Sequence, residues 1–174
     1  SDLPGAFSGR QRLKADAAFT WPEAPGARGG AVDLRTLSGR RNSDFTTQLI
    51  DPRRDDAWFS AWNPRAGLLL AYHWRRTDYP WVGNWEENHA RTNAPWRGRA
   101  LTRGMEFANT PFPTTLQDAV ARGRMHGEPT FRWLPARGNA VTAYTILLTP
   151  LAAGPRGVRD IRTGPRGPVV TLAE

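Results

Sequence analysis

The sequence predicts an all-β protein built as an antiparallel β-sandwich, and three observations point to this class. The 15 prolines and 17 glycines divide the 174-residue chain into short segments, as expected for short strands joined by turns. Apolar residues alternate along many of these segments with the period of two that is typical of a half-buried strand. Hardly any helix separates the segments. Because parallel strands need crossover connections of about a dozen residues or more, the strands are expected to pair antiparallel.

The individual strands are expected in segments bounded by turn residues. The clearest is GLLLAYHW at 67–74, an apolar and aromatic run that follows the turn signal NPRAG. AVTAYTILLTP at 140–150 has the same character and ends at Pro150, and 101–108 forms a further strand. Shorter strands are predicted at 31–37, 45–50, 57–62, 130–135 and 168–172.

The remaining segments complete a single domain over residues 1–174. One short helix at most is predicted, near 114–122, where Leu116, Ala119 and Val120 fall on one face and glycine follows. The polar, glycine-rich segment 152–167 is expected to be an exposed loop that carries the last strand. A chain of this length can bury about 70% of its unfolded surface, which is enough for an ordinary core.

Composition excludes several kinds of chemistry and partner. The net charge is +8, but 23 of the 24 basic residues are arginines spread along the chain rather than gathered in a stripe, so nucleic acid is not the expected partner. Cysteine is absent, and the three histidines lack metal-ligand spacing, so neither a metal nor another cofactor is expected. No apolar run approaches the roughly 18 residues of a membrane-spanning helix. We therefore expect a soluble chain with no membrane partner, and favour the cytoplasm over the periplasm.

Tryptophan is concentrated in one part of the chain. Six of the eight tryptophans lie between residues 58 and 96. Large aromatic side chains fill the cores of small sandwiches, and they also stack on the apolar faces of sugars. The segment YPWVGNWEENHARTNAPWRG adds polar side chains that could bind sugar hydroxyls. Because neighbouring strand residues point to opposite faces, at most one of Glu86 and Glu87 can join a site, and the other is expected at the solvated surface.

Glu106 is the most specific candidate for chemistry. In a strand from Leu101 to Ala108, this acid shares its face with Thr102, Gly104 and Ala108. Small neighbours would leave a hollow that a ligand can approach closely, as glycine within a strand often indicates. The alternative is an ordinary surface face with one solvated carboxylate.

These residues resemble a known family. RGMEFANTPFP is similar to the strand that carries the catalytic glutamate of the aldose 1-epimerases, which are galactose mutarotase-like proteins. NSDFTTQLIDP resembles their Asp-containing segment, and Asp44 precedes Glu106 by 62 positions, about the separation in that family. The stretch 78–107 resembles an uncharacterised bacterial branch of the same superfamily. The resemblance spans roughly residues 19–150, and its motifs lie between Asp44 and Pro113.

The resemblance implies a β-supersandwich whose concave sheet binds a sugar, with Glu106 as general base on the anomeric hydroxyl. In the family a histidine acts as general acid, and a further histidine and an arginine contact the sugar, all in the half that precedes these motifs. No histidine here stands at such a position. We therefore expect this chain to be the C-terminal half of a larger supersandwich, with the missing N-terminal half as its partner. The expected substrate-binding residues are Asp44, Trp81, Trp85, Glu86, Asn88 and Trp96.

The leading hypothesis for function is aldose 1-epimerase-like interconversion of sugar anomers. Mutarotation needs one base and one acid and no cofactor, and Glu106 can supply only the base. The alternative is a carbohydrate-binding module of the same fold without turnover. An arginine-rich nucleic-acid binder is a distant third possibility.

Overall fold

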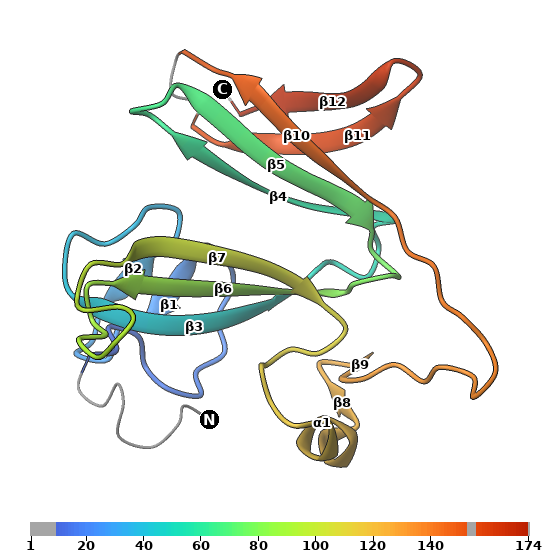
Figure 1. Cartoon of the computed structure of the whole chain (residues 1–174), viewed down its shortest axis with the longest axis horizontal. Coiled ribbons are helices and arrows are strands. Elements are labelled where there is room, and N and C mark those ends of the chain that lie inside the picture. Colours follow the sequence, from blue (N-terminus) through green and yellow to red (C-terminus); the bar gives the residue numbers. More distant parts are fainter. Residues whose placement is uncertain (1–9, 153–155, 174) are drawn as a thin grey trace.

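The computed structural model, which describes residues 10–152 and 156–173, is an all-β fold with 45% strand and 4% helix. All the strand pairs are antiparallel (Figure 1). The elements are β1 (Glu23–Pro25), β2 (Ala31–Asp33), β3 (Asn42–Leu49), β4 (Asp56–Asn63), β5 (Leu68–Arg75), β6 (Trp81–Asn88), β7 (Leu101–Ala108), α1 (Leu116–Arg122), β8 (Arg124–Met125), β9 (Glu128–Pro129), β10 (Tyr144–Pro150), β11 (Val158–Gly164) and β12 (Gly167–Leu172).

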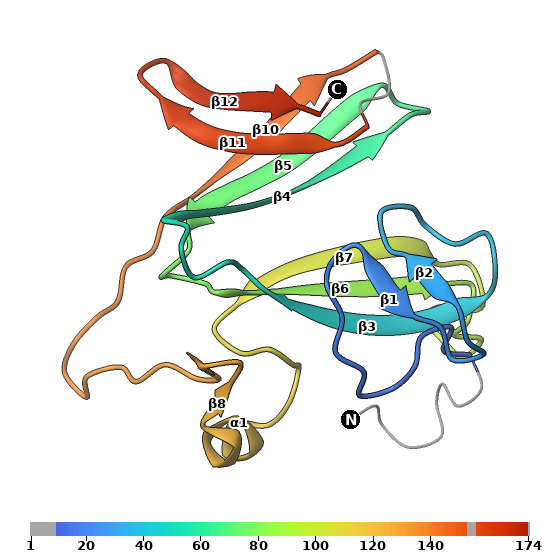
Figure 2. The same cartoon turned by 180° about the vertical axis from the view of Figure 1, so that it is seen from behind.

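Two three-stranded sheets form the two layers of the sandwich. Their strand orders are β3–β6–β7 and β10–β5–β4, and three hairpins, β1–β2, β8–β9 and β11–β12, form separate two-stranded sheets. The hairpin β11–β12 lies on the side of the second sheet that faces away from the first (Figure 2). Its residue Ile161 is only 1% exposed, so this hairpin covers the outer face of that sheet.

Phe107 lies at the centre of the contact between the two sheets. Its ring stacks on Trp74 of β5 with 4.8 Å between centroids, and it lies 5.2 Å from Tyr144 of β10 and 5.1 Å from Tyr79. Val82 of β6 completes the same cluster. The alternation of β5, β7 and β10 therefore directs one aromatic row from each sheet into a shared core, which confirms the predicted antiparallel sandwich.

Most of the predicted elements are present with small shifts of their ends. The helix Leu116–Arg122 begins after Thr115, whose hydroxyl accepts a hydrogen bond from the backbone N–H of Asp118. It ends at Gly123. No helix in the described part of the chain is long and apolar enough to cross a membrane.

Two predictions about local structure are wrong. Residues 130–135 do not form a strand, because Trp133 is 78% exposed and packs edge-on against Phe131 rather than against a neighbouring strand. The segment 152–167, predicted to be an exposed loop, contains strand β11. Residues 153–155 of this segment lie outside the described residues. Its strand pattern is concealed by charged residues, yet buried Ile161 and the pairing with β12 hold it in a sheet.

Candidate functional site

The sheet β3–β6–β7 carries every predicted site residue except Trp96, and its register determines which of them meet. Cross-strand partners lie on the same face of a sheet. Glu106 is paired with Gly83, Trp85 with Gly104, and Trp81 with Ala108. This side is called the Glu106 face.

The opposite side of the sheet, called the Glu86 face, carries the other predicted polar residues. Here Glu86 is flanked by Asp44 and Arg103, and Asn88 by Asn42 and Leu101. The sheet therefore separates the predicted residues into two groups. Glu106 shares a face with Trp81 and Trp85, whereas Asp44, Glu86 and Asn88 lie on the other side.

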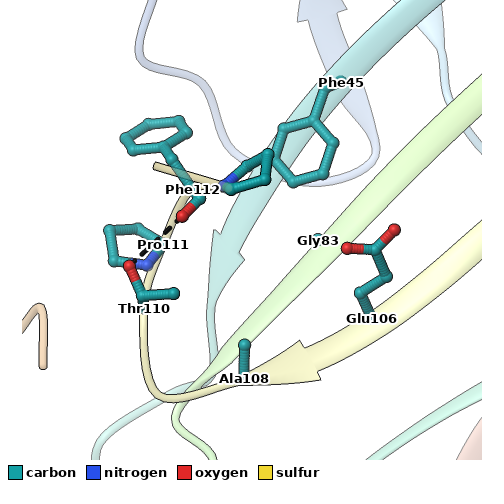
Figure 3. A pocket seen from close by; sticks show the side chains of 8 residues that line it. Phe45, Gly83, Glu106, Ala108, Thr110, Pro111 and Phe112 are labelled. Carbon is teal, nitrogen blue, oxygen red and sulfur yellow. Dashed lines mark hydrogen bonds between the residues drawn. The ribbon is translucent and has the colours of Figure 1, made fainter. Parts of the chain in front are cut away.

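A small pocket of about 70 Å³ opens beside Glu106 (Figure 3). Its walls come from β3, β6, β7 and the proline-rich turn that follows β7. Within the turn, the Thr110 hydroxyl donates to the Phe112 carbonyl at 3.3 Å, which helps to fix the wall. The lining residues are Phe45, Gly83, Glu106, Ala108, Thr110, Pro111, Phe112 and Pro113.

The glycines near Glu106 have a specific steric role. A Cβ atom on Gly83 would lie 2.7 Å from the Cζ atom of Phe45, and one on Gly104 would lie 3.2 Å from Cε3 of Trp85. Both distances are shorter than an ordinary contact, so the rings of the neighbouring strands lie across these glycines. The small residues therefore leave a shallow pocket, because much of the expected hollow is filled by aromatic rings.

The pocket has a simple set of chemical groups. Glu106 is exposed, and no described residue donates a hydrogen bond to it or pairs with its charge. The other described lining residues contribute apolar surface and the Thr110 hydroxyl, and none of them can act as an acid at neutral pH. The arrangement can accept hydrogen bonds from a ligand beside an apolar wall, but it contains a base without a matching acid.

Trp85 and Trp96 hold an arginine between them. The Arg91 guanidinium lies 5.1 Å from the Trp85 ring and 5.2 Å from the Trp96 ring, and the two indoles meet edge-on at 5.6 Å. Cation–π contact of this kind stabilises the loop that follows β6. The structure thus brings Trp85 and Trp96 together, but neither ring lines the pocket at Glu106.

Trp81 is completely buried. Its side chain is 0% exposed, and its indole N–H donates to the Pro129 carbonyl at 3.1 Å. Although Trp81 points to the Glu106 face, it joins the sheet to the β8–β9 hairpin and offers no surface to a ligand in this structure.

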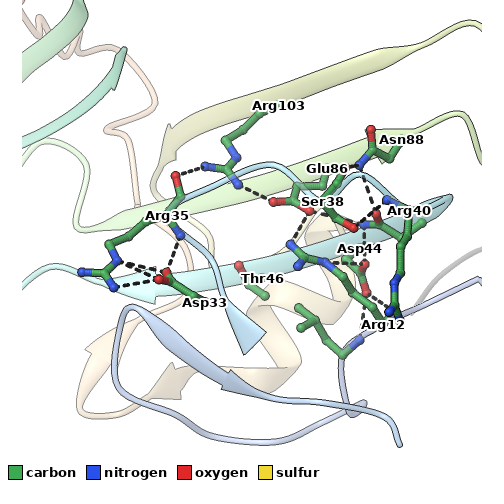
Figure 4. A network of polar contacts seen from close by, with 12 residues as sticks. Arg12, Asp33, Arg35, Ser38, Arg40, Asp44, Thr46, Glu86, Asn88 and Arg103 are labelled. Atoms are coloured by element: carbon green, nitrogen blue, oxygen red, sulfur yellow. Dashed lines mark hydrogen bonds and ion pairs between the residues drawn. The ribbon is translucent and has the colours of Figure 1, made fainter. Parts of the chain in front are cut away.

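The Glu86 face holds a buried ionic network (Figure 4). Glu86 is 1% exposed and accepts from the guanidinium groups of Arg12, at 2.5 Å, and Arg103. Asn42 donates to both Asp44, at 2.8 Å, and Glu86, at 3.3 Å. Two carboxylates can be buried together here because two arginines neutralise them.

Asp44 joins the N-terminal segment to this network. Its Oδ1 atom accepts the backbone N–H groups of Arg12, at 3.0 Å, and Leu13, at 3.2 Å. Burial raises the pKa of Asp44 above 3.8, although its hydrogen bonds with Asn42 and these amides act in the opposite direction. Through these hydrogen bonds, Asp44 attaches the N-terminal segment at Arg12 and Leu13 to strand β3.

The expectation that Glu86 or Glu87 lies at the solvated surface is wrong. The two carboxylates do point to opposite faces, but Glu87 is 0% exposed and Glu86 is 1% exposed. Glu87 is buried because its Oε1 atom accepts the backbone N–H groups of Ala90 and Arg91 at 2.8 Å, and the Arg91 side chain lies 3.2 Å from Oε2. The loop that follows β6 folds back over this acid.

Sequence reasoning did not identify the arginines of the network. Arg12 lies 74 positions from Glu86 in the chain, and no local pattern indicates that contact. Arg103 could have been found, because it is on the strand face opposite Glu106 and the register places it beside Glu86. Among the described residues, no cluster of three or more acids and histidines could hold a metal ion.

Comparisons with protein-family models, characterised proteins and solved structures find no match to this chain.

Proposed function

We propose that this chain binds a carbohydrate on the Glu106 face. The observation that carries the proposal is an exposed carboxylate, Glu106, which has no hydrogen-bond or ion-pair partner among the described residues and is set beside an apolar wall that includes Phe45 and Pro111. Sugars present hydroxyl groups next to an apolar C–H surface. The carboxylate can accept hydrogen bonds from the hydroxyl groups, and the apolar wall can contact the C–H surface. The resemblance to galactose mutarotase-like proteins supports the same class of ligand.

The size of the pocket limits how a sugar would bind. Pockets that enclose a whole ligand usually measure about 300 Å³ or more, and this one measures about 70 Å³. It would therefore receive one edge of a sugar ring, with hydroxyl groups directed at Glu106 and the rest of the ring on the surface. We expect weak binding, with dissociation constants of about 1 mM.

NMR titration of the 174-residue chain with a panel of aldoses tests this proposal. Shifts should be concentrated at Phe45, Gly83 and Ala108, and the Glu106→Gln variant should bind at least several-fold more weakly. Ala108→Leu should also weaken binding, because it fills the pocket without removing the carboxylate. If no aldose produces saturable shifts at these residues, the proposal is wrong.

Turnover of sugar anomers is the second candidate. Its support is that Glu106 has no hydrogen-bond donor among the described residues, so its oxygens are available to remove a proton. An acid would have to come from outside the described lining residues. If turnover occurs, Glu106→Gln should slow anomer exchange by about two to four orders of magnitude, as measured by exchange NMR. An unchanged rate in this variant would rule out Glu106 as the base, and carbohydrate binding without turnover would remain as the proposed function.

A further inference from the structure

Within the described residues, strand β10 is an unprotected edge of its sheet. It pairs with β5 on one side, and on the other side it makes no backbone hydrogen bond to residues 10–152 or 156–173. An open edge presents N–H and C=O groups that can pair with a further strand. Soluble proteins usually protect such edges with charged residues, proline or a covering segment.

Both edges of the other sheet, β7 and β3, do have this protection. On β7, the free edge of the other sheet, Arg103 and Glu106 supply charges. The outer edge of β3 is covered by the N-terminal segment, where the Ser43 N–H donates to the Arg10 carbonyl at 3.2 Å. In contrast, the seven residues of β10, YTILLTP, include no charged side chain, and its proline comes at the end.

The side chains of β10 are also more exposed than those of a covered strand. Tyr144 is 52% exposed, Ile146 53% and Leu148 63%. These three alternate residues share the face that contains the contact between Tyr144 and Phe107, so they continue the core surface beyond the point where the other sheet covers it. An additional strand would pair with the open backbone edge and place its own side chains beside this apolar row.

We propose that β10 pairs antiparallel with β10 of a second copy of this chain about a twofold axis at Leu147. The central residues Thr145 to Thr149 read T-I-L-L-T, which is nearly the same in both directions. An axis at Leu147 places Ile146 opposite Leu148 of the second copy, and Thr145 opposite Thr149. The pairing is therefore self-complementary on both faces, as a twofold interface requires.

Charge also favours this edge for contact between two copies. Each chain carries a net charge of +8, so two copies repel one another over most of their surfaces. The β10 strand itself carries no charged side chain, so its pairing places no like charges of the two strands opposite each other. Raising the salt concentration should tighten the dimer, because salt screens the remaining repulsion.

The small size of the contact predicts a reversible dimer. One strand pair and three half-exposed side chains per copy lie at the low end of the interface range, so we expect a dissociation constant of about 10 to 100 µM. The proposal does not depend on carbohydrate binding, because β10 belongs to the other sheet and contributes no residue to the Glu106 pocket.

Sedimentation equilibrium of the full 174-residue chain, between about 5 and 500 µM, tests the dimer. Leu148→Lys adds a charge to the edge at an exposed position and should weaken association at least tenfold. Leu101→Lys is the matched control, because Leu101 is 57% exposed at the start of the other edge strand, and it should leave association unchanged. Far-UV dichroism would verify that both variants are folded.

A cysteine at the proposed axis tests the register independently. The chain has no cysteine, so Leu147→Cys introduces a single thiol. Directly opposed residues of antiparallel strands have Cβ atoms about 4.5–5.5 Å apart, so mild oxidation should give a disulfide-linked dimer far faster than with Leu101→Cys. Equal cross-linking of the two variants would refute the axis. A chain that stays monomeric at about 500 µM, or a dimer that Leu148→Lys does not weaken, would overturn the proposal.

Discussion

Replacing Glu86 with glutamine should destabilise the protein strongly, because this buried carboxylate holds two arginines in the network of the Glu86 face. Glu86 is 1% exposed and accepts charge-assisted hydrogen bonds from Arg12 and Arg103. Glutamine has nearly the same shape, so the substitution leaves little cavity. It removes the charge, however, and presents an NH₂ group where an arginine needs an acceptor.

The expected magnitude follows from these contacts. A hydrogen bond to a charged group is worth about 1.5–3 kcal/mol, and removing one partner of a buried ionic group costs about 3–5 kcal/mol. The Arg12 and Arg103 side chains are 20% and 15% exposed, so water can partly solvate them after the change. We therefore expect Glu86→Gln to lower the free energy of unfolding by about 3 kcal/mol.

Urea denaturation followed by tryptophan fluorescence measures this difference. Glu106→Gln is the matched control, because it is the same chemical change on the adjacent strand at an exposed carboxylate, and it should shift the free energy of unfolding by less than about 0.5 kcal/mol. A cost below about 1 kcal/mol for Glu86→Gln would show that the network contributes little and would refute the reasoning.

Three further predictions concern the core, the pocket wall and pH. Phe107→Ala should lower the free energy of unfolding by about 3–5 kcal/mol in the same assay, because Phe107 joins the two sheets. Gly83→Ala should cost about 1–3 kcal/mol, since its Cβ would lie 2.7 Å from the Phe45 ring, and Phe45→Leu should recover part of the loss. The raised pKa of Asp44 means that the folded state holds this proton more tightly than the unfolded state. Its contribution to stability is therefore present below pH 3.8 and is lost as pH rises through the folded pKa, so wild type should lose stability relative to Asp44→Asn across that interval. A constant difference between the two proteins at all pH values would contradict this assignment.

The longer strands of the two core sheets were predictable because their alternation is a local signal. The hairpin strand β11 and the contacts that bury charge were not, because they depend on distant parts of the chain. Alternation in β5, β7 and β10 indicates which residues face the core. The same alternation in β6 correctly places Glu86 and Glu87 on opposite faces. Their burial depends on Arg12, 74 positions from Glu86, and on a loop that folds back over Glu87. The same limit applies to Gly83, since its small size is explained by Phe45 of the adjacent strand rather than by its own neighbours in sequence.

The paired indoles of Trp85 and Trp96 give this protein an internal optical reporter. Their rings are 5.6 Å apart at an angle of 74°, close enough for their electronic transitions to couple. Coupled indoles produce a pair of dichroism bands of opposite sign at their strong far-ultraviolet transition, and this signal disappears when the rings separate. Because Trp96 belongs to the loop after β6 and Trp85 to the sheet, the bands report the docking of that loop separately from unfolding of the whole chain. Loop release at moderate temperature could thus be followed without any added label.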